Sequence, residues 1–590
     1  MKAAMTVVKV DLCEPGGAPC SSCRESFVKD KACVLPMAPS GLALPARFVC
    51  DNTRSNVNVT FYDSIRGVCD TKAPQWGGLH AQRTCIGGPT LSYAIECVTA
   101  AGALLAPPPA VCDDGRLMPS CIHALGATRP RASKWLHERE PQLASADDVP
   151  SQMHLALGAA PGTMTLTWIT RNECPASAVW WRGHRVAASS TTYSVPKRWW
   201  QPTVMRWVHT ATLDGLESRA EFSYVLGDNV TTGCKVLPMP IAARAPPTRG
   251  TLPISTAMMA DVGSINVLGF ATWAALDSRS QPGERLDIDL VVHAGDVSYA
   301  GMDVAVRALN VTRTDEWEPL WDLYGVAHEA VTRRRAYMVG IGNHEAWYNW
   351  TAVSHRYPMT QSSPSELAAL ARPPFWYSFV SGGVHWTMLS SEHDYAAGSD
   401  QYAFAAAALA AVDRTLTPWS VVAFHRPMYC TEAGEYSTSR PGGRLQRELE
   451  PLLLAHDVDL VVNGHQHGYE RIHPNVAGNV TARLTPLPGG DHGYVRPAAP
   501  VYLMVGHGGA AQDETWVTPP PEWSAVRFSQ GCDFTGGHRR CGGSHGGSWE
   551  YTDTFGWMHA EFVNRTHVQL HTEMVSGSLG DEFWLVRDDK

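Results

Sequence analysis

The pattern of apolar and polar residues changes twice along this chain of 590 residues. Residues 1–130 show little helical periodicity, and weak alternation at 57–62 and 91–94 predicts only short strands. Between 148 and 245, apolar and polar residues alternate in several short segments, a pattern typical of half-buried strands. Strands at this spacing predict a β-sandwich.

From residue 251 onward the pattern is that of an α/β domain, because apolar runs rich in Val and Ile alternate with helical stretches. The expected buried strands are 288–293, 337–341, 419–424 and 458–462, and the expected helices are 401–414 and 444–456. The tail is expected to add strands at 501–505, 556–562 and 567–574. We therefore expect three domains: a small module over 1–130, a β-sandwich over 148–245 and an α/β domain over 251–590.

Composition and charge exclude several classes of protein. With 44% hydrophobic and 18% charged residues, the chain is globular rather than disordered. A net charge of -9 argues against a nucleic-acid-binding protein. The sequence contains no run of eighteen apolar residues, so we expect no membrane span.

Cysteine usage points to an oxidising compartment. Ten of the 15 cysteines lie between Cys13 and Cys121, so we expect disulfides to staple the module at 1–130. Six Asn-x-Ser/Thr sequons agree with a glycoprotein that is secreted, or delivered to a vacuole or lysosome. No signal peptide is evident at residues 1–11, so either a leader is missing from this sequence or export uses another route; we favour the missing leader.

The later cysteines allow two further pairs. We expect Cys174 to pair with Cys234, and Cys532 with Cys541. Cys430 is then left over, either as a thiol or as a bridge between the chains of a homodimer.

Five short motifs carry the candidate chemistry, and each follows a predicted buried strand. They are Asp261-Val262-Gly263, Gly295-Asp296-Val297-Ser298-Tyr299, Gly342-Asn343-His344-Glu345, Val422-Ala423-Phe424-His425 and Gly464-His465-Gln466-His467. Ligands gather at the carboxyl ends of strands in α/β sheets. We therefore expect the motifs to meet and to hold two metal ions, a common device for cleaving phosphate esters.

The donor types divide between two kinds of metal. Asp261 and Tyr299 are hard anionic donors that suit Fe(III), whereas Asn343, His425 and His465 are neutral donors that suit a divalent Zn, Mn or Fe. Asp296 can bridge the two ions, and His467, two residues after His465, can turn to the other metal, the one that His465 does not hold, if the segment is extended or tightly turned.

The expected reaction is an in-line attack on phosphorus by a metal-bound hydroxide, with the substrate phosphate on the divalent ion. His344 follows a predicted ligand and is the best candidate to contact the phosphoryl or leaving-group oxygen, with Glu345 as its orienting partner. His385 and His393 are better explained as structural residues than as ligands.

In this order the motifs resemble those of the purple acid phosphatases, within the metallophosphoesterase superfamily. The segments 294–300, 425–429 and 464–471 match as well, and the resemblance covers 148–590. It implies the large plant-type form, with a fibronectin type III-like sandwich before an α/β metallophosphoesterase sandwich domain. It also implies Fe(III) on Asp261, Asp296, Tyr299 and His467, and the divalent ion on Asp296, Asn343, His425 and His465.

One feature departs from the family pattern. Many plant relatives carry another histidine, which helps to bind substrate, in the loop after the first metal-ligand histidine. This chain has no histidine between His425 and His456. The loop offers Glu432, Glu435, Tyr436 and Arg440 instead, and we expect Glu435 to contact the substrate together with Asn343 and His344.

Three functions follow as hypotheses. The first is an exported acid phosphatase acting on small phosphate monoesters. The second is a phosphodiesterase or nucleotide pyrophosphatase on the same metal centre. In the third, the module at 1–130 binds a glycan or another protein in adhesion, and phosphatase activity is secondary.

Overall fold

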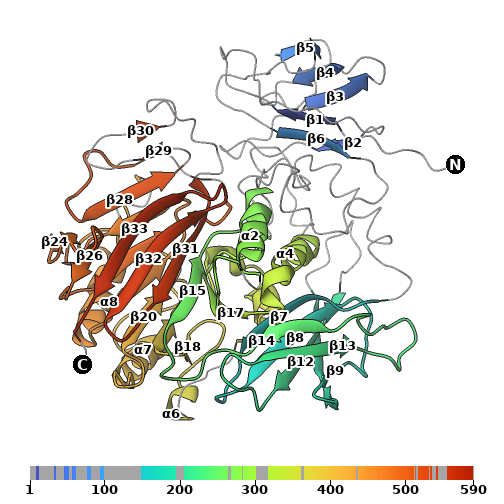
Figure 1. The fold of residues 1–590 in the computed structure, drawn as a ribbon, viewed down its shortest axis with the longest axis horizontal. Helices are drawn as coiled ribbons and strands as arrows, with labels where there is room; N and C mark the ends of the chain where they lie inside the picture. Colours follow the sequence, from blue (N-terminus) through green and yellow to red (C-terminus); the bar gives the residue numbers. More distant parts are fainter. Residues whose placement is uncertain are drawn as a thin grey trace.

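The structure is a computed structural model of the chain (Figure 1). It describes residues 148–194, 205–263, 267–281, 284–300, 317–359, 365–433, 436, 438–510, 512, 516–529 and 554–588, together with the backbones of eight further strands. Six of these strands form two three-stranded sheets near the N-terminus: β1 (Val8–Asp11), β6 (Ala94–Val98) and β2 (Ala32–Val34), then β3 (Ala46–Asp51), β4 (Asn56–Phe61) and β5 (Trp76–Ala81). The expected pairing of the ten early cysteines lies outside the described residues.

Residues 151–244 form two sets of antiparallel strands. One set is β7 (Ser151–Leu157), β8 (Met164–Thr170), β12 (Met205–Leu213) and β11 (Ser189–Ser194), and the other is β10 (His184–Ala187), β9 (Ala178–Trp181), β13 (Glu221–Gly227) and β14 (Ile241–Arg244). Leu166 and Trp168 of the first set and Val179 and Leu226 of the second are buried in one hydrophobic core. The alternation in the sequence therefore marks strands whose apolar side chains face each other across two layers.

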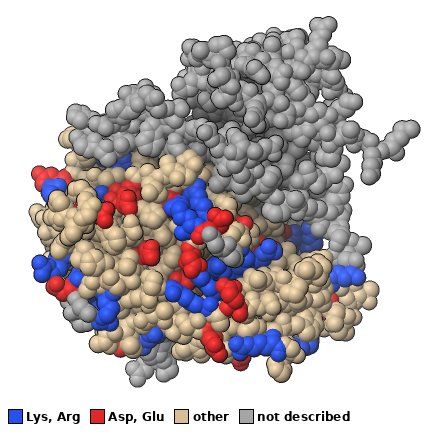
Figure 2. Space-filling view, in the orientation of Figure 1, with Lys and Arg blue, Asp and Glu red and all other residues tan. Residues whose placement is uncertain are grey.

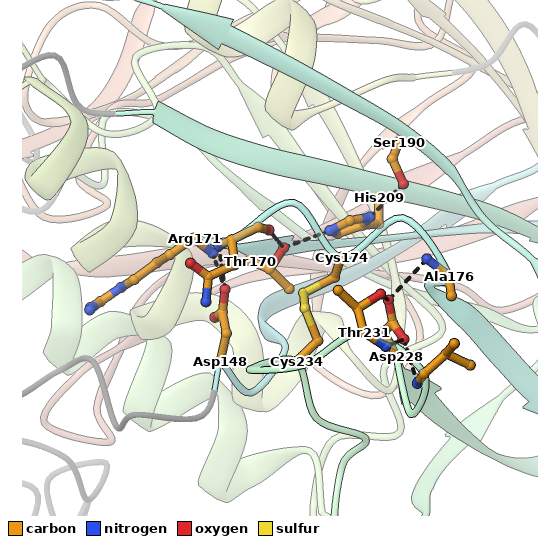
Figure 3. The surroundings of a disulfide bond; sticks show 12 residues. Asp148, Thr170, Arg171, Cys174, Ala176, Ser190, His209, Asp228, Thr231 and Cys234 are labelled. Carbon is orange, nitrogen blue, oxygen red and sulfur yellow. Dashed lines mark hydrogen bonds between the residues drawn. A yellow bond between two sulfur atoms is a disulfide. The ribbon is translucent and has the colours of Figure 1, made fainter.

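A disulfide joins Cys174 to Cys234 beside this pair of sheets, as the sequence predicted (Figure 3). The bond closes a loop across 60 positions of sequence. Asp228 lies next to it and accepts hydrogen bonds from the backbone N–H groups of Ala176 at 2.9 Å and Thr231 at 2.9 Å. The loops at this end of the strands are therefore held by a covalent bond and by a carboxylate.

The first sheet of the α/β region contains three parallel strands, β15 (Ile254–Met259), β16 (Leu290–Ala294) and β17 (Ala336–Gly340). Antiparallel strands β31 (Gly556–Phe562), β32 (His567–Met574) and β33 (Leu579–Val586) extend it beyond β15, and β26 (His492–Val495) and β25 (Thr485–Pro486) follow β33. On the other side, Ala336 of β17 pairs with Leu155 of β7. The sheet thus continues from the region before residue 250 into the region after it.

The second sheet also has a parallel centre. Its order is β18 (Tyr377–Ser381), β19 (Val384–Met388), β20 (Trp419–Ala423), β21 (Leu460–Asn463), β27 (Val501–Val505), β22 (Tyr469–Ile472), β28 (Ser524–Ser529), β29 (Cys532–Asp533) and β30 (Arg540–Cys541). Strands β19, β20, β21 and β27 run parallel. The ladder of β29 and β30 sets Cys532 opposite Cys541, while the expected bond between their side chains lies outside the described residues.

Alternate residues of the second sheet enter two different cores. Val421 of β20 and Leu460 of β21 join the core shared with the first sheet, whereas Val422 and Val461 face the opposite side. On that side they meet the helices α7 (Asp400–Ala410) and α8 (Arg444–Ala455). Helices α2 (Val267–Arg279) and α4 (Trp317–Thr332) supply apolar residues to the first core. The result is an α/β sandwich with buried strands, which explains their continuous apolar sequences.

The smaller elements complete the chain. They are the 3-10 helix η3 (Asn343–Glu345), the helices α5 (Thr351–Arg356) and α6 (Ser365–Ala368), and the hairpin of β23 (Asn475–Val476) and β24 (Asn479–Val480). None of the helices in the described part of the chain has both the length and the apolar character that a membrane span requires. On the face drawn in Figure 2, acidic and basic side chains are interspersed and form no single basic patch.

Candidate metal centre

The five motifs begin at the carboxyl ends of parallel strands in both sheets. Asp261 follows β15, Asp296 follows β16 and Asn343 follows β17, all in the first sheet. His425 follows β20 and His465 follows β21 in the second sheet. Because the two sheets face each other, these strand ends bring the motifs together, which is the arrangement that the sequence predicted.

Three predicted ligands form one cluster. The Tyr299 hydroxyl lies 2.8 Å from Asp261 Oδ1 and 2.8 Å from His467 Nε2. His467 Nε2 lies 3.7 Å from the same Asp261 oxygen. A carboxylate, a phenol and an imidazole therefore present their polar atoms to one point, as the donors of a single metal ion do.

A second cluster lies around His425. Its Nε2 is 3.1 Å from Asp296 Oδ2 and 3.2 Å from Asn343 Oδ1. Donor atoms of Asp296, His425 and His465 all lie within 4.8 Å of one another. The two clusters are linked, because the backbone N–H of His465 donates a 2.7 Å hydrogen bond to Asp261 Oδ2.

The tautomer of His425 shows that the second cluster fits a cation. Its Nδ1 lies 3.0 Å from the carbonyl oxygen of Ala294, which can only accept a hydrogen bond, so Nδ1 carries the proton. A neutral His425 then turns the lone pair of Nε2 toward two oxygen acceptors, Asp296 Oδ2 and Asn343 Oδ1. Three acceptors facing one another need a positive charge between them, and a divalent ion supplies it.

The pKa values of the clustered side chains also indicate that the site needs positive charge. Burial raises the pKa of Asp261 to about 6, since a buried carboxylate is costly without a counter-charge. Burial alone would lower the pKa of His425, but Asp296 and Asp261 raise it to about 10, so a second proton on this imidazole supplies the positive charge between the acceptors when no metal ion does. Burial and the neighbouring Asp261 raise the pKa of Tyr299, so this side chain is a phenol unless a cation draws the proton away.

His344 lies on the open side of the two clusters. Its side chain is 21% exposed, and its Nε2 lies 3.7 Å from Asp296 Oδ2. The ring packs on that of Tyr299, with 4.6 Å between the centroids, and its backbone N–H donates to Asp296 Oδ1 at 2.9 Å. Burial lowers the pKa of His344. The side chain is thus anchored from behind while its edge remains accessible.

Glu345 has a different position from the one expected. The sequence suggested that it orients His344, but its carboxylate accepts three backbone N–H groups, from Gly342 at 2.8 Å, Asp296 at 2.9 Å and Val297 at 2.9 Å. It is 1% exposed, and burial with the nearby Asp296 raises its pKa to about 8. Glu345 therefore ties the loop of Asp296 to the turn that carries Asn343.

Backbone geometry explains the glycines of the motifs. Asp261 and Asp296 adopt φ values of 57° and 52°, in the left-handed region that non-glycine residues rarely occupy. A side chain on Gly342 would put its Cβ 2.3 Å from Asp296 Oδ1, and one on Gly464 would put it 2.4 Å from Asp261 Oδ2. Only glycine lets these loops approach the carboxylates so closely.

Three other residues from the sequence analysis are placed as follows. Glu435 lies outside the described residues, so its predicted contact with substrate stays a prediction. Cys430 is buried with its Sγ 3.4 Å from Met504 Sδ and forms no disulfide, so a bridge between chains through this thiol is not supported. His393 lies on the loop after β19, where its Nδ1 is 2.8 Å from Ser390 Oγ.

Sequence reasoning missed Arg426. Its Nη1 lies 2.9 Å from His465 Nε2, and its Nε donates to Glu392 Oε1 at 2.8 Å. Its position directly after His425 in the sequence could have suggested that Arg426 lies beside the metal centre. Its partner Glu392 comes from a loop that only the fold brings near.

Comparison with known families places these motifs in context. The family model described as calcineurin-like phosphoesterase matches residues 256–469, a span that contains all seven predicted ligands. The model described as iron/zinc purple acid phosphatase-like protein C matches residues 499–582, which include β31 and β32.

Individual proteins agree with the family models. Purple acid phosphatase 18 of Arabidopsis thaliana is 28% identical over 403 residues, which cover 65% of this chain and 77% of that protein. Phosphoenolpyruvate phosphatase of Allium cepa is 30% identical over 252 residues, or 40% of this chain and 47% of that protein.

A solved purple acid phosphatase from yellow lupin seeds has a similar fold. It superposes with a TM-score of 0.58 at 19% identity, covering 91% of this chain and 81% of the lupin chain. The expectation of a phosphatase enzyme is confirmed, and the chain belongs to the purple acid phosphatases of plant type, within the metallophosphoesterases.

Proposed function

We propose that this chain is an exported acid phosphatase that hydrolyses small phosphate monoesters at a two-metal centre. The observation that carries the proposal is the convergence of seven donor side chains into two linked clusters at the strand ends of two facing sheets. The purple acid phosphatase family implies a binuclear centre of iron with a second iron, zinc or manganese.

The donors divide between two ions as the sequence suggests. Asp261, Asp296, Tyr299 and His467 would hold Fe(III), and Asp296, Asn343, His425 and His465 would hold the divalent ion. When bound, the two ions supply Lewis acidity, which draws charge from the phosphate and acidifies water.

The side chains of the protein orient the substrate. His344 offers its accessible edge to a phosphoryl or leaving-group oxygen, and its backbone bond to Asp296 fixes where that edge points. A neutral imidazole can donate one proton in a hydrogen bond to an oxygen that gains charge in the transition state. His344 and Asp296 are therefore the residues on which we expect turnover to depend most.

Export and domain organisation form the second part of the proposal. The Cys174–Cys234 disulfide supports folding in an oxidising compartment, as in a secreted or vacuolar protein. The two sets of strands with a shared core support a fibronectin type III-like domain over 148–245, before the catalytic domain over 251–590. Binding of a glycan or protein by the module at 1–130 stays a prediction.

Substrate profiling tests the proposed function. The purified chain is assayed at pH 5 with phenyl phosphate and with diphenyl phosphate, in parallel with the Asp296→Asn variant. We expect the monoester to be hydrolysed with the larger kcat/KM, and the variant to lose this activity. Preferential cleavage of the diester would replace the monoesterase by a phosphodiesterase on the same centre, and no cleavage of either would overturn the proposal.

A further inference from the structure

Arg426 occupies an unusual position in the loop after β20. Among residues 421–432, it is the one residue that is not buried, because the chain enters the core again directly after it. Met428, Tyr429 and Cys430 are each at most 1% exposed. This loop therefore sends one accessible side chain toward the metal centre within that span.

Two contacts fix the guanidinium of Arg426. Its Nε donates to Glu392 Oε1 at 2.8 Å, and the Glu392 side chain is only 12% exposed. Its Nη1 lies 2.9 Å from His465 Nε2, so the cation stands beside a predicted ligand of the divalent ion.

The acidic partner of Arg426 is itself held in place. Ser391 Oγ donates to Glu392 Oε1 at 3.0 Å and accepts the backbone N–H of Arg426 at 2.9 Å. The backbone N–H of Glu392 donates to Ser390 Oγ at 3.2 Å. The loop after β19 is thus built to hold Arg426 in one orientation.

Arg426 retains donors for a ligand. A guanidinium has five N–H groups; Glu392 accepts the one on Nε, and His465 takes at most one on Nη1. In the described part of the chain, the remaining three have no partner. With its side chain 35% exposed, Arg426 can bind an oxyanion through the paired N–H groups that match carboxylate or phosphate geometry.

We propose that Arg426 determines substrate specificity by binding a second anionic group on the leaving group of the phosphate ester. The substrate class is then a small ester whose leaving group carries a carboxylate or another phosphoryl group. This inference rests on the proposed function.

The test compares phosphoryl donors that have or lack a second anionic group, and for each donor it compares the variant with wild type. Wild type and Arg426→Gln are assayed with phenyl phosphate, which has a neutral leaving group, with phosphoenolpyruvate, which adds a carboxylate, and with pyrophosphate, which adds a phosphoryl group. We expect the substitution to lower kcat/KM for at least one doubly anionic substrate by about 10- to 100-fold, mainly through KM, and to change phenyl phosphate less than about 3-fold. The substrate whose kcat/KM falls shows which anionic group, the carboxylate or the phosphoryl group, Arg426 binds.

Variants of neighbouring residues separate this role from a structural one. Arg426→Lys keeps the charge but loses the planar fork, so an intermediate loss is expected. Arg444→Gln removes an exposed arginine that pairs with Asp394, which lies on the same loop as Glu392. This control variant should not change the ratio of kcat/KM between the doubly anionic substrates and phenyl phosphate. Metal content and thermal unfolding are measured for each variant, because Arg426 touches His465.

Two outcomes decide the matter. A selective loss for a doubly anionic substrate at unchanged metal content supports the proposal. An equal loss for all three substrates, or none for any, overturns it and leaves the proposed phosphatase intact. If the wild-type chain hydrolyses none of them, the proposed function itself has failed, which is a different result.

Discussion

Glu345 accepts a 2.9 Å hydrogen bond from the backbone N–H of Asp296, so a residue of the third motif fixes the loop of the second. The same carboxylate binds Val297 and Gly342, which keeps Asp296 in its left-handed conformation facing His425. A strained backbone persists only where its surroundings enforce it. Glu345 is therefore a positioning residue of the metal centre.

Replacing Glu345 by Gln should weaken metal binding. The amide keeps one oxygen acceptor but puts an N–H₂ group in place of the other, opposite at least one of the backbone N–H donors, and donors cannot bond to one another. We expect the affinity for the divalent ion to fall by about 10- to 100-fold, as for other residues that orient metal ligands, and kcat to fall with metal occupancy. Equilibrium dialysis with zinc measures the change, and Glu522→Gln, which alters an exposed carboxylate, is the control. Unchanged zinc affinity would contradict the positioning role.

Replacing His344 by Asn should separate turnover from metal binding. The side chain is outside the set of seven predicted ligands and has an accessible edge, so its loss should leave the metal content as in wild type. We expect kcat for phenyl phosphate to fall by about 10²- to 10⁴-fold, the range for a positioned proton donor. Elemental analysis and steady-state kinetics on one preparation make the comparison. Loss of metal in parallel with activity would instead make His344 a structural part of the centre.

Glu573 should make stability depend on acid pH. Burial alone would raise its pKa, but hydrogen bonds from His571 and Arg285 outweigh burial and lower it to about 2 from an ordinary value of 4.5. A lowered pKa means that the carboxylate stabilises the fold above pH 4.5, and that this contribution is lost as the pH falls toward 2. The thermal midpoint of Glu573→Gln should lie below that of wild type at pH 7, and the gap should narrow below pH 4.5. A gap independent of pH would show that this charge does not contribute.

The disulfide of the β-sandwich region should contribute to stability. Joining Cys174 to Cys234 closes a loop across 60 positions, which restricts the unfolded chain and stabilises the fold by about 2–4 kcal/mol. The double variant Cys174→Ser, Cys234→Ser should therefore unfold at a lower temperature. Cys430→Ser is the comparison, because that buried cysteine is in no disulfide. An unchanged unfolding temperature in the double variant would show that the disulfide does not stabilise the fold.

Local pattern predicted most of the elements in the α/β region. The predicted strands at 501–505, 556–562 and 567–574 coincide with β27, β31 and β32. The first is a continuous apolar run, as in a strand buried on both faces, whereas residues 567–574 alternate as in a half-buried antiparallel strand. Helix α8 begins at Arg444 as expected and ends one residue before the predicted limit. Helix α2 was not predicted, because its apolar residues are spread around the helix instead of forming one stripe.

The candidate site was predictable as a set of residues but not as a set of contacts. Strand-end placement indicated that the motif residues would meet, since this follows from parallel topology. The clamp by Glu345 and the contact between Arg426 and Glu392 depend on how loops from different strands fold over one another. The pairing of β7 with β17 is likewise a tertiary contact with no signal in local sequence.

The most direct test of the central claim is the metal content of the purified chain, compared with that of Asp296→Asn. Asp296 belongs to the His425 cluster and is the expected bridge to the Tyr299 cluster. Its carboxylate should therefore be needed for the chain to bind both metal ions. Elemental analysis should find about two ions per wild-type chain and clearly fewer in the variant, with Asp287→Asn, an exposed carboxylate, as control. Two ions retained in Asp296→Asn, or none in wild type after refolding with iron and zinc, would contradict the account.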